Sequence, residues 1–241
     1  MDDSMSRRLR LFPLNSVLFP GAVLNLHVFE PRYKQMIAEC VKSGESFGVA
    51  LIAEGAEAGD PNVTPHTIGS VAEIVEVQEL PFGRYLVSTI GRERFRISAV
   101  VIREPYLTVE AEMLDEDAAH DDEIDDLTQR VHALFEQYVQ MSIEFSGQET
   151  SVELPGDAQG TAYLVGDSLQ VSESIKQRLL ELSDTRARLR SERDFLERLL
   201  PQLRSLLEHR RTELAARQER GDAPEYRNDQ EKFFGKFFSL N

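Results

Sequence analysis

The sequence contains a single cysteine, Cys40, among its 241 residues. One thiol cannot form an intramolecular disulfide, and one chain with one thiol cannot build a multi-cysteine zinc site. No apolar run approaches the roughly 20 residues that a membrane span requires. We therefore expect a cytoplasmic protein in a reducing compartment, with no membrane partner.

Motifs for catalysis are also missing. The Gly235-Lys236 pair has Gln230 where a phosphate-binding loop needs its first glycine, and no G-x-S-x-G segment is present. The five histidines do not have the spacing of a zinc site. The sequence thus predicts no catalytic residues, no cofactor and no metal site, so we expect that the protein is not an enzyme.

Positive charge is scarce and unevenly distributed. The formal net charge is −15, and residues 113–175 carry 15 acidic side chains but only one basic side chain. Basic residues after position 176 alternate with acidic ones, which is typical of a solvated helix and not of a surface that follows a phosphate backbone. Nucleic acid is therefore excluded as an expected partner.

The first half of the chain has the pattern of strands and turns. Leu24, Leu26 and Val28 alternate with polar residues, and one helix is expected from Pro31 to Gly44. Close spacing without further helices predicts a curled antiparallel sheet or barrel. The expected strands are 24–28, 47–53, 68–77, 85–90, 95–101 and 107–113.

The second half changes to a helical period. One apolar stripe runs from Ile124 to Tyr138, and Pro201 is expected to stop or kink the last helical segment. The fold class is therefore α+β, with three parts: a β-rich subdomain at 1–118, a helical bundle at 119–220 and a tail at 221–241. The expected helices after the stripe are 157–168, 173–182, 185–199 and a continuation to about 220.

The tail is rich in phenylalanine. Phe233, Phe234, Phe237 and Phe238 would lie on one side of a short helix, because they are spaced by four residues. Such a cluster predicts an interaction segment that docks either on the protein's own body or on a partner subunit.

Five segments closely resemble the N-terminal domain of Lon proteases, also called the Lon substrate-binding domain, and a sixth, in the helices, resembles it more weakly. The resemblance extends to about residue 200, and it implies a PUA-like β-rich subdomain followed by a helical bundle. The segments are LFPLNSVLFPGAVLNLHVFEPRY at 11–33, FGVALIAEG at 47–55, IGSVAEIVEV at 68–77, PFGRYLVSTIGRERFRI at 81–97, PYLTVEAEMLDED at 105–117 and KQRLLELSDTRARL at 176–189.

In full-length Lon proteases an ATPase module and a serine-lysine peptidase domain follow this domain, and the sequence to Asn241 contains neither. The resemblance therefore implies a stand-alone, non-catalytic module that recognises unfolded or exposed polypeptide segments. A protease or a chaperone is the partner that such an adaptor would serve.

Peptide capture needs an open sheet edge or an apolar groove between the two subdomains. The groove candidates are apolar and aromatic residues, several of which lie in turns: Leu14, Val17, Leu18, Phe19, Tyr33, Phe82 and Tyr106. Two alternatives remain open. The helices at 185–220 and the tail would support a self-assembling protein and a homo-oligomer, and a PUA-like fold would also suit a small-molecule binder.

Overall fold

The computed structural model describes residues 6–56, 60, 62–116, 121–147 and 152–220. The chain forms two compact units, which we call the sheet unit and the helical unit. The sheet unit comprises Met1–Asp117, Gly166–Ser168 and Glu173–Ser183, and the helical unit comprises Ala118–Val165, Leu169–Ser172 and Asp184–Asn241.

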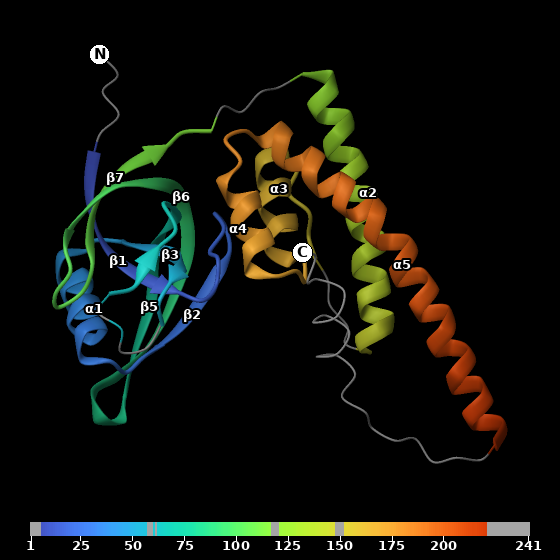
Figure 1. Ribbon diagram of the computed structural model, residues 1–241, viewed down its shortest axis with the longest axis horizontal. Helices are drawn as coiled ribbons and strands as arrows, with labels where there is room; N and C mark the ends of the chain where they lie inside the picture. The colour runs from blue at the N-terminus through green and yellow to red at the C-terminus, as the bar shows by residue number, and fades with distance from the viewer. Residues whose placement is uncertain (1–5, 57–59, 61, 117–120, 148–151, 221–241) are drawn as a thin grey trace. The chain divides into compact units, whose positions relative to one another are not determined.

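The strands of the sheet unit curl into a closed ring (Figure 1). Around the ring the order is β1-β7-β6-β5-β3, and β3 then pairs with β1 through the parallel register Leu11↔Gly48 to Leu14↔Leu51. The other pairings are antiparallel, and β2 and β4 pair with β6 and β3 outside the ring. The strands are β1 (Ser6–Leu14), β2 (Val23–Val28), β3 (Phe47–Glu54), β4 (Thr64–Pro65), β5 (Ile68–Leu80), β6 (Arg84–Ile102) and β7 (Thr108–Leu114).

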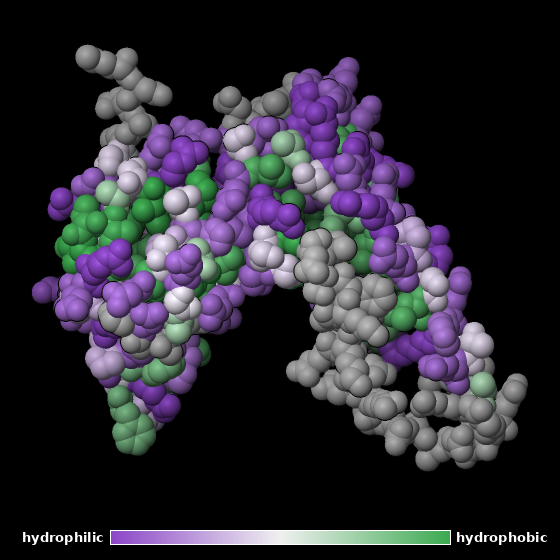
Figure 2. Space-filling view, viewed as in Figure 1, coloured by the Kyte–Doolittle hydropathy of each residue, from purple (hydrophilic) through white to green (hydrophobic). Residues whose placement is uncertain are grey.

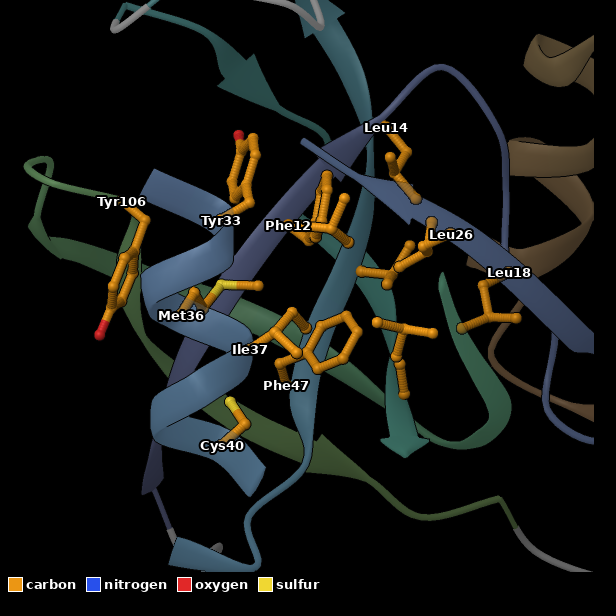
Figure 3. Packing of buried hydrophobic residues seen from close by; sticks show 14 residues of the cluster. Phe12, Leu14, Leu18, Leu26, Tyr33, Met36, Ile37, Cys40, Phe47 and Tyr106 are labelled. Atoms are coloured by element: carbon orange, nitrogen blue, oxygen red, sulfur yellow. The ribbon is translucent and has the colours of Figure 1, made fainter. Parts of the chain in front are cut away.

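Helix α1 (Pro31–Ser43) packs against this sheet through one apolar face. The sequence starts the helix at a proline and ends it at Gly44, whose φ of 68° is the left-handed conformation that glycine adopts without strain. Met36, Ile37 and Cys40 point from α1 toward the strands (Figure 3) and are fully buried. The buried thiol agrees with a structural role for this cysteine.

A second apolar cluster is built by strands and their connections without α1, and Phe95 lies at its centre with no exposed surface. Strand β6 passes close to the turn before β2 at Gly91. A Cβ atom at this position would lie 2.1 Å from the carbonyl oxygen of Phe19. The glycine is therefore required by a close backbone approach, which no side chain can accommodate.

Helix α4 (Glu173–Glu181) belongs to the sheet unit. The Arg94 guanidinium donates hydrogen bonds of 2.7 Å to the carbonyl oxygens of Leu180 and Leu182, and it forms a 2.9 Å ion pair with Glu116. Gln177 also donates to the Ile68 carbonyl. The sequence analysis grouped this segment with the helical bundle, because its local pattern is helical and the contacts that attach it to the sheet are not visible in the sequence.

The helical unit is organised around α2 (Asp122–Ser146) and α5 (Thr185–Arg220), with α3 (Ala158–Ser168) alongside. Ile124, Val131, Tyr138 and Phe145 repeat every seven residues and are buried. Three ion pairs each join a residue of α2 to the residue of α5 that lies 67 positions later in the sequence. Because this offset is the same along both helices, α2 and α5 run parallel, as in a coiled coil. These pairs are Glu123–Arg190, Arg130–Glu197 and Glu144–Arg211.

The predicted α+β class is confirmed, but four elements differ from the prediction. Strands β1 and β4 were not expected, β6 is one strand where two were expected, and α5 continues through Pro201. Burial of Leu200 and Leu203 on either side of Pro201 stabilises the continued helix despite the missing N–H. The boundary at 118/119 and the phenylalanine-rich tail lie outside the described residues and remain predictions.

None of the helices in the described part of the chain is both long enough and apolar enough to cross a lipid bilayer.

Candidate functional site

A cavity of about 620 Å³ opens on the sheet unit between the end of β1 and residues 24–28 of β2. We call it the β2 groove. Its walls are formed by Phe12, residues 14–16, residues 24–30, Tyr33 and Ala56. The groove is thus built by two strand segments and the first turn of α1.

The sequence of β2 produces a strand with one buried and one exposed face. Leu26 and Val28 are buried, whereas Asn25 and His27 are exposed. Because side chains alternate along a strand, this pattern fixes which face of β2 packs on the core. Residues 24–28 line the groove, and one backbone edge of the strand faces away from β6.

That edge has no strand beside it in the described ranges. The ladder of β2 is with β6, in antiparallel register from Val23↔Ile90 to Val28↔Tyr85. The nearby end of β1 pairs with β3 instead. An edge strand presents backbone N–H and C=O groups that an added strand can use, so the β2 groove can accept an extended polypeptide.

The floor of the groove is aromatic and closely packed (Figure 3). The rings of Phe12 and Tyr33 stack with their centroids 4.0 Å apart and an interplanar angle of 12°. The Arg32 guanidinium lies 4.6 Å from the centroid of the Tyr33 ring, and its Nε donates a 3.0 Å hydrogen bond to Glu30. These contacts hold the floor in one arrangement.

The rim of the groove exposes one large apolar side chain. Phe29 is 55% exposed, and its ring lies 5.9 Å from that of His27. This ring is accessible, so the rim can contact an apolar ligand.

A charged cluster lies on the other side of α1. The hydroxyl of Tyr106 donates to Glu39, which lowers the pKa of that carboxyl, while burial followed by the Glu39 bond raises the pKa of Tyr106. Arg10 pairs with Glu45 at 2.6 Å and with Glu39 at 3.4 Å. The cluster ties α1 to β1 and to the turn before β7, which is a structural role.

Two of the seven residues predicted for peptide binding, Leu14 and Tyr33, line the β2 groove. Each is less than 5% exposed, so they form its floor. Tyr106 lies in the charged cluster instead. All residues that line the β2 groove belong to the sheet unit.

Three further predicted residues hold the turn between β1 and β2. Val17 donates its backbone N–H to the Glu173 carboxylate at 2.7 Å, and the Leu18 carbonyl accepts a 2.6 Å hydrogen bond from Ser70. Phe19 has no exposed surface. These contacts give the three residues structural roles, and a ligand has no direct access to Phe19 in this conformation.

Phe82 lies apart from the others, at the tip of the β5–β6 hairpin. It is 91% exposed and adopts a φ of 66°, which is uncommon for a residue with a side chain. Figure 2 shows this tip as a hydrophobic projection of the surface. The residue is accessible, but the structure does not bring it to the β2 groove.

Several groove residues were missed by the sequence analysis, among them Asn25, His27, Phe29 and Glu30. The alternation of residues 24–28 was a visible signal for a strand. It gave no indication that the strand would lie at an edge, because edge position depends on which distant segments pair.

The described residues contain no group of three or more His, Cys, Asp or Glu side chains arranged to hold a metal ion. His132, at a helical spacing from Glu136, instead makes a 2.8 Å hydrogen bond with Thr161.

The fold is that of Lon N-terminal domains. A Lon N-terminal domain protein from Xanthomonas campestris superposes with a TM-score of 0.58 and 26% identity, covering 77% of this chain and 96% of that one. The N-terminal domain of a Mycobacterium avium complex Lon protease gives a TM-score of 0.59 over 79% of this chain and 98% of that one, at 20% identity.

The model of the ATP-dependent protease La (Lon) substrate-binding domain matches residues 8–198, and the chain belongs to this family. Lon protease of Syntrophomonas wolfei is 31% identical over 187 residues, which are 76% of this chain and 23% of that protein. Lon protease 1 of Bacillus subtilis is 27% identical over 81% of this chain and 26% of its own length. The chain thus spans about a quarter of these relatives, and the match is to the substrate-binding domain.

Proposed function

We propose that the sheet unit binds extended, apolar polypeptide segments by adding them as a strand to the free edge of β2. The observation that supports this proposal is the β2 groove, which combines an unpaired strand edge with an apolar floor and rim. Membership of the Lon substrate-binding domain family agrees with a protein ligand.

The groove favours an extended segment for two reasons. Backbone hydrogen bonds to a strand edge do not depend on the ligand's sequence, so unfolded segments of many proteins can form them. Alternate side chains of the added strand would then face the aromatic floor at Phe12 and Tyr33. Strand β2 has six residues, so a segment of about this length can pair with it. Burial of a few apolar side chains supports roughly micromolar affinity, which corresponds to a binding free energy of about 8 kcal/mol.

Strand addition can be tested with methylated peptides. A peptide of about the length of β2, with apolar side chains at alternate positions so that one register is favoured, is prepared in two forms, with N-methyl groups on either set of alternate amides. Because only every second N–H of an added strand points to β2, one form should bind like the parent peptide and the other should lose binding. Equal binding of both forms, measured by isothermal titration, would exclude strand addition.

The place of binding can be tested with matched surface substitutions. Phe29→Ser removes an exposed apolar side chain from the groove rim, and Val75→Ser removes one of similar exposure, 58%, from β5 outside the groove. We expect weaker binding of an unfolded model protein for the first variant and unchanged binding for the second. Equal affinities for both variants would place the ligand elsewhere on the molecule.

A further inference from the structure

A second cavity, of about 550 Å³, lies in the helical unit along one side of α2, and we call it the α2 groove. Its apolar wall contains Val139, Ile143, Val152 and Leu154, each half-buried. Val139 follows the coiled-coil residue Tyr138 by one position, so it lies about 100° around the helix from the face that α5 covers. The groove therefore lies beside the α2–α5 contact, with which it shares Glu144.

The rim of the α2 groove is acidic. Glu136 and Glu144 line it, and the lining includes no basic residue in the part of the chain that the structure describes. Glu144 also pairs with Arg211 of α5, so Glu136 is the rim carboxylate that a cationic occupant would meet first. A suitable occupant is thus a short segment that carries aromatic or aliphatic side chains together with positive charge. A cavity of about 150 Å³ holds one benzene molecule, so the α2 groove has room for more than one aromatic ring.

We propose that residues 231–241 of the same chain occupy the α2 groove. This segment carries Phe233, Phe234, Phe237 and Phe238 beside Lys232 and Lys236. Residues four positions apart are neighbours on one face of a helix, so the lysines and the phenylalanines would each form a row. Such rows match a groove that has an apolar wall and a carboxylate on its rim. Burial of a phenylalanine removes a large apolar surface from water, which favours docking over exposure of four rings.

The chain is long enough to make this contact within one molecule. Arg211 of α5 pairs with Glu144 on the rim of the groove. The helix then continues to Arg220, which at 1.5 Å per residue is about 14 Å farther on. Residues 221–232 span up to about 40 Å when extended, which exceeds that distance.

Tethering also makes a weak site sufficient. A short connecting segment raises the local concentration of its end to the millimolar range, so a groove with a dissociation constant of about 0.1 mM would be mostly occupied. The tail of a second molecule would have to reach the same groove from solution, where its concentration is only micromolar. Docking within the chain is therefore favoured over exchange between chains.

The test uses the full chain, which contains no tryptophan. Phe234→Trp places a single tryptophan in the tail, and its emission wavelength and acrylamide quenching report its exposure. We expect emission at a shorter wavelength than that of free tryptophan, reduced quenching, and no change on dilution. Solvent-like emission would overturn the proposal, and a shift to longer wavelength on dilution would assign the contact to a second copy instead.

Two pairs of variants locate the site. Ile143→Ser in the groove should shift the tryptophan emission to longer wavelength, whereas Leu206→Ser, at a half-buried position on α5, should not. Circular dichroism establishes that each variant keeps its helices. If Ile143→Ser unfolds, Glu136→Lys on the rim replaces it, with Gln129→Lys one heptad earlier as the control. Identical emission in groove and control variants would overturn the assignment of the α2 groove. These readouts do not depend on whether the β2 groove binds peptides.

Discussion

Arginine side chains connect distant parts of the chain in both units, but in different surroundings. In the sheet unit, Arg94 and its partner Glu116 are 2% and 1% exposed, and the same guanidinium holds the last turn of α4. In the helical unit, the side chains of the Arg130–Glu197 pair are 57% and 41% exposed. One ion pair is therefore inside the unit, and the other lies in water.

This difference determines what each pair does. Breaking a buried pair leaves an uncompensated charge away from water, which costs about 3 to 5 kcal/mol. An exposed pair is screened by solvent and contributes about 0 to 1 kcal/mol. We infer that the buried arginine is required for the attachment of α4, whereas the pairs between α2 and α5 mainly favour one register of helices that their apolar residues already hold together.

The largest effect is expected for Arg94→Ala. The substitution removes the arginine partner of Glu116 and the hydrogen bonds to the Leu180 and Leu182 carbonyl groups, so we expect a loss of about 3 to 5 kcal/mol in the free energy of unfolding. Arg96→Ala is the control, because Arg96 lies on the same strand and is 53% exposed. Urea denaturation measures both. A loss below about 1 kcal/mol for Arg94→Ala would contradict the comparison.

Cys40 provides a second measurement of this variant. Burial raises the pKa of its thiol to about 11, so it should be unreactive toward alkylating reagents at neutral pH in the folded sheet unit. It is the protein's only thiol. Faster labelling in Arg94→Ala than in Arg96→Ala would show that the sheet unit opens more often.

A smaller but clear effect is expected for Gly91→Ala. The added Cβ would lie 2.1 Å from the Phe19 carbonyl oxygen, so the backbone must move, at a cost of about 1 to 3 kcal/mol. Gly156→Ala is the control, since nothing lies within 4 Å of its Cβ position. Thermal denaturation compares the two, and equal melting temperatures would mean that the turn before β2 adapts freely.

The coupling between Arg130 and Glu197 should be weaker still. A double-mutant cycle with alanine at both positions should give about 0.2 to 1 kcal/mol, decreasing as salt is added. A coupling above about 2 kcal/mol, or one that salt does not reduce, would show that the exposed pairs behave like the buried one.

The smallest effect concerns pH and the start of α2. Asp121 accepts a 2.9 Å hydrogen bond from the Ile124 N–H and pairs with Arg186, and both interactions lower the pKa of its carboxyl. Its stabilising contribution is therefore complete above the unfolded-state pKa of about 3.9 and is lost as the pH falls through the lower folded-state value. Asp121→Asn retains a capping oxygen without titrating.

Circular dichroism between pH 2 and pH 6 measures this difference. The wild-type protein should be more stable than Asp121→Asn at pH 6, and the difference should shrink as the pH falls. A constant difference across this range would show that the carboxylate charge at the cap does not matter.

The elements that were predicted well have strong local patterns. The helix from Pro31 has a proline at its start, a regular apolar face and a glycine at its end, all within 14 residues. The heptad positions of α2 are equally regular. The residues at 6–14 have no such regularity, because β1 packs one part against β7 and another against β3, and apolar residues are buried on both faces.

The candidate site was predicted only in part, for a related reason. Apolar character in a turn pointed to Val17, Leu18 and Phe19, but the same character is required of residues that fill a core, which is where the structure places them. Phe29 was missed although its side chain is 55% exposed. The exposure of a residue depends on which other segments cover it, and the residue type alone does not indicate which segments these are.

The local order of this protein follows from its sequence: the strand and helix periods, the capping residues and the family motifs specify a curled sheet with one helix and then a set of helices. The parallel orientation of α2 and α5 became visible only in the structure. Tertiary structure decides which strand remains at an edge, which glycine has no room for a side chain, and that α4 packs on the sheet through Arg94. These properties depend on contacts between residues that lie dozens of positions apart, such as the 86 positions from Arg94 to Leu180. Local patterns do not indicate which distant segments pair with each other, because burial and hydrogen bonding in the whole unit select that pairing.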